Sequence, residues 1–268
     1  MKDPITPDPH DRFFKETFSR PEHAVPFFKG ALPEKISREL DWQSLSRQET
    51  NFLDEILAAR SADLLFQLKW KKHDCFLYCL FEHQSRVDRK MPMRLLRYML
   101  AIWTDWEKQN PNALKFPIIF AIVLYQGSPK WEYGVNFKEL IDCPIECGSD
   151  VESMIPNFEY ILIDIHDEGI QAQFKDWQAR QILSLMAKVF DSSDSKEGIV
   201  GLEILSELSK HLKNDLTYLR TVLTYLFSVS GEVDKSTVKQ QINKLDNNQL
   251  KDATMTLLEQ LRSEGLEQ

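Results

Sequence analysis

The chain has 268 residues, of which 43% are hydrophobic and 28% charged, and its formal net charge is −8. These values indicate a globular protein with one large domain or one domain with an appendage, and the low glycine content argues against a low-complexity chain. No apolar run approaches the roughly 18 residues that a membrane span needs, and the polar first ten residues lack the apolar core of a signal peptide. We therefore expect a cytoplasmic protein with no membrane partner.

The first part of the chain is predicted to be mostly helical. A short helix begins near His10, with Asp11 available as its cap, and Pro21 interrupts it. Residues 22–30 form a second helical piece. Residues 44–57 mix polar and apolar side chains, and we expect them to lead into a strand.

Two short, strongly apolar strands are predicted next, over residues 60–70 and 75–84. The polar segment Lys71-Lys72-His73-Asp74 separates them. A short polar break between two such runs is typical of a β-hairpin.

The register of this hairpin decides where its acidic residues lie. If Trp70 pairs with Cys75, Asp63 lies directly opposite Glu82, with Cβ atoms roughly 4.5–5.5 Å apart, and Gln84 points to the same face. Opposed carboxylates repel each other unless a positive charge lies between them, and a divalent cation such as Mg²⁺ would supply it. A slip of one residue would place the two acids on opposite faces.

A helix and two further strands complete an α/β region. Apolar residues at helical spacing predict a helix over residues 91–108. Residues 116–125 are continuously apolar, which is typical of a strand covered on both faces. Residues 158–165 are a further strand candidate, and Asp164 near its end is in a position common to site residues and to caps. The order of elements indicates a small mixed sheet flanked by helices.

The remainder of the chain has a helical period. Helices are predicted over residues 174–190, 199–212, 216–229, 234–245 and 247–261. We place an α/β domain at residues 1–205 and a helical C-terminal region at residues 206–268.

Two apolar stripes on the last helices favour packing or self-association. A homodimer through this region is therefore a hypothesis, and an ordinary helical cap on the core is the alternative. The stripes consist of Leu216, Val222, Leu223, Leu226 and Phe227, and of Leu245, Leu250, Leu257, Leu258 and Leu261.

Positive charge gathers around the predicted hairpin. Nine basic and four acidic residues lie between Arg60 and Arg97, although the chain as a whole is acidic. A basic segment around an acidic metal pocket suits a phosphodiester substrate such as DNA, and a solvated surface is the alternative.

The four cysteines form two Cys-x3-Cys pairs. Cys75 and Cys79 lie in a predicted strand, where buried free thiols are expected. Cys143 and Cys147 lie in a loop-like stretch. Zinc binding is the weaker interpretation of this spacing, and disulfides are weaker still.

Five short motifs occur together and in order. They are His10-Asp11-Arg12-Phe13-Phe14-Lys15, Arg60-Ser61-Ala62-Asp63-Leu64, Phe81-Glu82-His83-Gln84-Ser85, Met93-Arg94-Leu95-Leu96-Arg97-Tyr98-Met99 and Leu124-Tyr125-Gln126-Gly127. As a set they resemble the Rpn family of recombination-promoting nucleases, also described as transposases, over roughly residues 8–190. The pattern Asp63…Glu82-x-Gln84 resembles the PD-(D/E)XK nuclease superfamily, which places an Asp on one strand and Glu-x-Lys on the next.

The resemblance implies a metal-dependent DNA endonuclease linked to recombination or mobile elements. It implies a PD-(D/E)XK restriction-endonuclease-like core with an all-helical C-terminal extension. Asp63 and Glu82 would hold the metal, with Mg²⁺ favoured over Mn²⁺ or Ca²⁺, and no organic cofactor is expected. Gln84 would replace the lysine of the superfamily. A glutamine positions water by hydrogen bonds but does not offset charge.

Accessory roles fall to one acid and three cations. Glu16 on the first helix is a candidate further acid, with a solvated helix face as the alternative. Arg60, Arg94 and Arg97 are candidates for the positive charge that Gln84 does not supply. The runner-up interpretation is a catalytically weak or inactive nuclease fold that serves as a DNA- or protein-binding module.

Overall fold

The computed structural model describes residues 8–50, 62–82, 87–127, 129–142, 149–190 and 215–229, with short helical pieces between residues 240 and 260. The described residues fall into two compact units. Residues 31–164 form what we call the sheet unit, and residues 1–30 with 165–268 form the helical unit. The predicted division between residues 205 and 206 lies outside the described residues.

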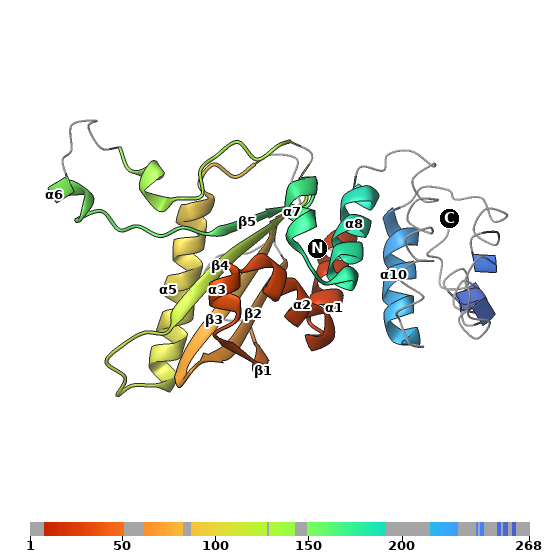
Figure 1. The fold of residues 1–268 in the computed structure, drawn as a ribbon, viewed down its shortest axis with the longest axis horizontal. Helices are drawn as coiled ribbons and strands as arrows, with labels where there is room; N and C mark the ends of the chain where they lie inside the picture. Colours follow the sequence, from red (N-terminus) through yellow and green to blue (C-terminus); the bar gives the residue numbers. More distant parts are fainter. Residues whose placement is uncertain are drawn as a thin grey trace, which may run out of the picture. The chain divides into compact units, whose positions relative to one another are not determined.

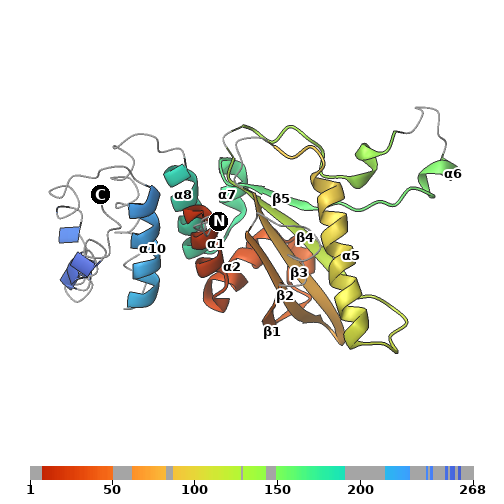
Figure 2. The same cartoon turned by 180° about the vertical axis from the view of Figure 1, so that it is seen from behind.

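The sheet unit contains a five-stranded mixed sheet in the order β1-β2-β3-β4-β5 (Figures 1 and 2). The first three strands are antiparallel neighbours, whereas β4 and β5 run parallel to β3. This arrangement confirms the predicted small mixed sheet. The strands are β1 (Leu40–Gln48), β2 (Ala62–Trp70), β3 (His73–Glu82), β4 (Ile118–Tyr125) and β5 (Ile161–Asp164).

The long helix α5 (Met91–Gln109) covers one face of this sheet (Figure 1). Its apolar side chains Leu95, Tyr98 and Ile102 are buried in one cluster with Leu80 and Val123 of the sheet. A fully buried apolar side chain contributes about 1.5–3 kcal/mol, so this helix–sheet interface contributes substantially to the stability of the sheet unit. Shorter helices in the unit are α3 (Glu34–Ser37), η1 (Phe137–Leu140) and α6 (Ser149–Glu152).

The turn between β2 and β3 is tighter than predicted. Trp70 pairs with His73, so the turn consists of Lys71 and Lys72 alone, and the predicted pairing of Trp70 with Cys75 is wrong. Lys71 has a φ of 57°, in the left-handed region that two-residue hairpin turns require. Lysines do not signal such a turn as Asn-Gly or Asp-Gly would, and for this reason the sequence suggested a longer break.

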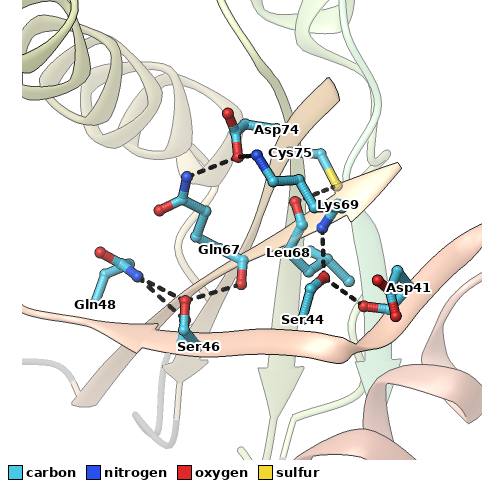
Figure 3. A network of polar contacts seen from close by, with 9 residues as sticks. All are labelled: Asp41, Ser44, Ser46, Gln48, Gln67, Leu68, Lys69, Asp74 and Cys75. Atoms are coloured by element: carbon cyan, nitrogen blue, oxygen red, sulfur yellow. Dashed lines mark hydrogen bonds and ion pairs between the residues drawn. The ribbon is translucent and has the colours of Figure 1, made fainter. Parts of the chain in front are cut away.

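Strand β1 was not predicted, because residues 44–57 lack a regular alternation of polar and apolar side chains. Its pairing with β2 shifts register between Asp41 and Ser46. Within this irregular stretch, Ser44 Oγ donates to the Asp41 carbonyl (2.6 Å) and accepts from the Lys69 amide (2.8 Å), as Figure 3 shows. A side chain thus replaces a backbone partner, which is how a bulged edge strand keeps its polar groups satisfied.

The helical unit contains α1 (Pro9–Phe18), α2 (Pro21–Ala31), α7 (Glu168–Gln173), α8 (Trp177–Phe190) and α10 (Leu216–Val229). The last residue of α2, Ala31, already belongs to the sheet unit. Asp8, and not Asp11, caps α1, because its Oδ1 accepts from the His10 amide (2.9 Å). No helix among the residues that the structure describes is long and apolar enough to cross a membrane.

The apolar side of α10 is used within the helical unit. Val222, Leu223 and Leu226 are buried, and the ring of Phe13 on α1 stacks on Tyr225 with centroids 4.1 Å apart. The predicted helices over residues 199–212, 234–245 and 247–261 lie wholly or largely outside the described residues, as does the second apolar stripe.

Candidate acidic site at one end of the sheet

The sheet topology brings Asp63 and Glu82 to the same end of the sheet. Strands β3, β4 and β5 are parallel, so their carboxyl ends share one edge, and antiparallel β2 begins there. Asp63 pairs with Leu80, and Glu82 lies two residues further along β3. The two acids are therefore diagonal neighbours on one face, roughly 7–8 Å apart at the backbone. The predicted direct opposition is wrong, but the shared face is as predicted.

Three of the predicted site residues have no described place in this site. Gln84 and Arg60 lie outside the described residues. Glu16 belongs to the helical unit, where its Oε1 accepts from the Arg12 Nε (2.8 Å) as an exposed ion pair on α1. Their roles in the site stay predictions.

Both carboxylates are almost fully withdrawn from solvent. Asp63 is 6% exposed and Glu82 is 2% exposed, on the sheet face that α5 covers. Burying a carboxylate is costly unless it is paired. Arg94, in the first turns of α5, meets this need, because its Nη1 donates to Glu82 Oε2 (2.7 Å). Asp88 lies on the rim, with its Oδ2 3.9 Å from the same Nη1.

The electrostatic coupling extends from Arg94 to both acids. Burial acts to lower the pKa of Arg94, but its neighbours Tyr98, Glu82 and Asp63 outweigh this and raise the pKa. Burial, followed by the negative charge of Asp63, raises the pKa of Tyr78 well above its usual value. Asp63, Glu82 and Arg94 therefore form one charged cluster beneath the start of α5.

Strands β4 and β5 add polar groups at the same edge. The backbone N–H of Gln126 donates to the backbone carbonyl of Glu82 (2.8 Å), and the Gln126 side chain is fully buried. Tyr125 pairs with Glu82 on one side and with Asp164 on the other. Burial, together with the negative charges of Asp164 and Glu82, raises the pKa of Tyr125 to about 12. Gly127 follows, and a Cβ there would lie 2.2 Å from the Tyr125 hydroxyl, so only glycine fits.

Tyr78 and Gln126 were not among the predicted site residues. Tyr78 shares the period-two face of Glu82, and this alternation is a signal that could have identified it. Gln126 lies within the Leu124-Tyr125-Gln126-Gly127 motif, but its proximity to Glu82 depends on the pairing of β3 with β4, which the sequence does not specify.

The donor set suits some metals better than others. No group of three or more His, Cys, Asp or Glu residues within the described ranges could hold a metal ion. A structural zinc site needs four such ligands, whereas Mg²⁺ uses one or two carboxylates with water and phosphate. Two carboxylates on one face would suit a magnesium-type cation only with water or phosphate as further ligands, and Arg94 would compete with that cation for Glu82.

The cysteine pair in β3 lies in the core of the sheet unit. Cys75 and Cys79 are free, buried thiols, as predicted. Burial is the main cause that raises the pKa of Cys75 to about 11 and that of Cys79 further. Cys143 and Cys147 lie outside the described residues.

A shallow pocket opens beside the charged cluster. It has a volume of about 210 Å³, and its lining includes Asp88, Arg94, Arg97 and Tyr98. Arg97 is exposed, whereas Arg94 extends beneath the surface toward Glu82. Both predicted accessory arginines of α5 thus line this pocket, and Arg94 also pairs with Glu82.

The chain is therefore an α/β protein with a mixed sheet. At one end of this sheet, buried carboxylates beside an arginine form a candidate acidic site. The family model described as "Putative transposase, YhgA-like" matches residues 8–217. The chain therefore belongs to this family. No solved structure matches it significantly.

Curated relatives carry the names of recombination-promoting nucleases. The chain is 27% identical over 270 residues to "Inactive recombination-promoting nuclease-like protein RpnE" of Escherichia coli K12, covering 99% of this chain and 85% of the relative. It is 25% identical over 267 residues to "Recombination-promoting nuclease RpnA" of the same strain, covering 96% and 84%. It is 35% identical over 126 residues to "Recombination-promoting nuclease RpnD" of Escherichia coli O157:H7, covering 46% and 47%.

Proposed function

We propose that this protein is a divalent-metal-dependent DNA endonuclease with a PD-(D/E)XK-type core, which acts in DNA recombination or mobile-element activity. The observation that supports this proposal best is the burial of Asp63 and Glu82 on one face at the end of the β2–β3 hairpin. Burying carboxylates contributes little or nothing to net stability even when a cation pairs with them, which favours a functional reason for their burial. The nuclease names of several relatives support the same class of reaction.

The roles of the residues follow from their chemistry. Asp63 and Glu82 would hold the cation, Mg²⁺ in first place, and Gln84 would position water or phosphate through hydrogen bonds. A divalent cation at such a site activates a water and stabilises the charge that develops on a phosphate. Arg94 would offset part of that charge in place of a lysine. Arg97, exposed at the mouth of the pocket, would contact the DNA backbone.

A second candidate function is DNA or protein binding without cleavage. The ion pair between Arg94 Nη1 and Glu82 Oε2 favours it, because this bond occupies a carboxylate that a metal would need. The neutral Gln84 and a relative named as inactive point the same way.

Plasmid cleavage separates the two functions. Supercoiled DNA is incubated with Mg²⁺, Mn²⁺, Ca²⁺ or EDTA and with wild type, Asp63→Asn or the control Asp105→Asn, which changes a partly exposed acid of α5. We expect metal-dependent nicking that Asp63→Asn abolishes and Asp105→Asn preserves. Salt-sensitive DNA binding without cleavage in any metal would support the binding module instead, and equal cleavage by all three proteins would indicate a contaminant.

We further propose that self-association, if a homodimer forms, uses a surface other than the buried part of the α10 stripe. Val222, Leu223 and Leu226 are already packed within the helical unit. A light-scattering mass equal to one 31.4 kDa chain would exclude the dimer.

A further inference from the structure

A second concave site lies at the opposite end of the same sheet. The β2–β3 turn, the last turns of α5 and the start of β4 enclose a pocket of about 480 Å³. His73 on its rim and Glu82 are nine positions apart on β3. At roughly 3.3 Å per strand residue, the pocket is about 30 Å from the acidic site, so the two sites cannot share one small ligand.

Aromatic rings make up a large part of the wall. Trp70 and Trp106 are partly exposed, and Phe116 is 54% exposed although its ring centroid lies 6.1 Å from that of Trp106. Ile118 in its wall is 47% exposed, and Leu114, which precedes the lining residue Lys115 in the chain, is 99% exposed. Rings left accessible in a hollow, with further apolar side chains around them, mark a surface that binds something rather than a core.

Lysines alternate with these rings. Lys71, Lys72 and Lys115 all line the pocket and are all exposed. Lys71 pairs with Glu39 (Nζ to Oε2, 2.9 Å), whereas Lys72 and Lys115 make no ion pair with any residue that the structure describes.

The acid in the wall of the pocket is already neutralised. Asp74 accepts from Lys69 Nζ (2.7 Å) and from Gln67 Nε2 (2.9 Å), as Figure 3 shows. The lining therefore presents a positive field beside aromatic faces, although the chain as a whole is acidic.

We propose that this pocket binds a single-stranded nucleic acid. A base would stack on the rings of Trp106 and Phe116, and the adjoining phosphates would lie against Lys72 and Lys115. Stacking platforms interleaved with cations are how single strands are bound without sequence preference. A duplex cannot use the pocket in this way, since its bases are paired and stacked on one another. The proposal does not depend on catalysis at the acidic site.

The test measures binding without cleavage. Fluorescence anisotropy follows the full chain, in EDTA, with labelled 20-mers of deoxythymidine or uridine and with a 20-base-pair duplex. EDTA removes the metal, so the readout is separate from the proposed nuclease activity. Binding of either single strand supports the proposal, and their relative affinities show whether the sugar matters.

Two variants and one control locate the binding to the pocket. Lys72→Glu/Lys115→Glu should weaken single-strand binding at least about tenfold. Phe116→Ala changes an exposed ring that the fold does not bury and should weaken it about five- to hundredfold. Lys130→Glu/Lys138→Glu changes two exposed lysines outside the pocket by the same total charge and should leave the affinity within about twofold.

Several results would overturn the proposal. Equal losses in both lysine pairs would reduce the binding to overall charge. Binding of the duplex at least as tightly as the single strands would remove the role of the rings. No binding of either single strand by the folded wild type would leave the exposed patch to another partner, such as a protein.

Discussion

Replacing Arg94 by methionine would reveal how much the acidic site depends on one ion pair. Glu82 is 2% exposed and Arg94 is 22% exposed, and their charged atoms are 2.7 Å apart. Removing one member of a buried pair leaves an uncompensated charge and costs about 3–5 kcal/mol. Because part of the Arg94 side chain still reaches solvent, we expect a loss at the lower end, about 3 kcal/mol in the free energy of unfolding.

Urea unfolding at pH 7 of wild type, Arg94→Met, Glu82→Gln and the double variant measures this coupling. The double variant should recover at least about 1.5 kcal/mol relative to the sum of the single losses. Arg97→Met removes an exposed cation one turn further along α5 and should change stability by less than about 0.5 kcal/mol. A loss below about 1 kcal/mol for Arg94→Met, or additive single effects, would refute the reasoning.

The same variants report on metal binding. If Arg94 and a cation compete for Glu82, the rise in melting temperature that Mg²⁺ or Mn²⁺ produces should be larger in Arg94→Met than in wild type. A ligand stabilises the folded state more when it binds that state more tightly. Glu82→Gln should abolish the rise. An equal rise in all three proteins would place the cation elsewhere.

Three other measurements test particular environments. Burial lowers the pKa of His23 to about 4. The stability that its neutral form contributes is therefore fully present above the unfolded pKa near 6.5, and the free energy of unfolding falls by about 3 kcal/mol as the pH drops toward 4. Urea unfolding at a series of pH values should show that His23→Gln flattens this pH dependence and that His73→Gln does not. Cys75 and Cys79 should resist iodoacetamide at pH 8 in the folded protein, as peptide mass spectrometry would show, because their thiols are buried. Gly127→Ala should cost about 1–3 kcal/mol in thermal unfolding, since its methyl group would lie 2.2 Å from a tyrosine hydroxyl; an unchanged melting temperature would contradict the close packing.

The elements that could be predicted from the sequence are those whose signal is local. Helices α5 and α10 have apolar residues at helical spacing and begin and end within one residue of the predicted positions. Strand β4 was identified by its continuous apolar run. Strand β1 was missed because Ser44 and Ser46 place polar side chains in its ladder with β2.

The site could be predicted only in part, because its geometry depends on pairings between distant segments. Asp63 and Glu82 were identified by their motif, and Arg94 by its charge near them. The contact of Gln126 with Glu82 depends on the parallel pairing of β3 with β4, which are separated by a whole helix in the sequence. No local pattern specifies this pairing, so the sequence did not indicate that contact.

The error in the hairpin register shows why the prediction of a shared face was robust. The pairing differs from the predicted one by two residues, because the turn has two residues instead of four. A shift of two preserves the side of the sheet to which each residue points, whereas a shift of one would have separated Asp63 from Glu82. Strand β3 is buried on both faces, so burial alone does not set this parity. An odd shift would instead turn Glu82 away from Arg94 and break their ion pair, so the observed register is the one that keeps this buried carboxylate paired.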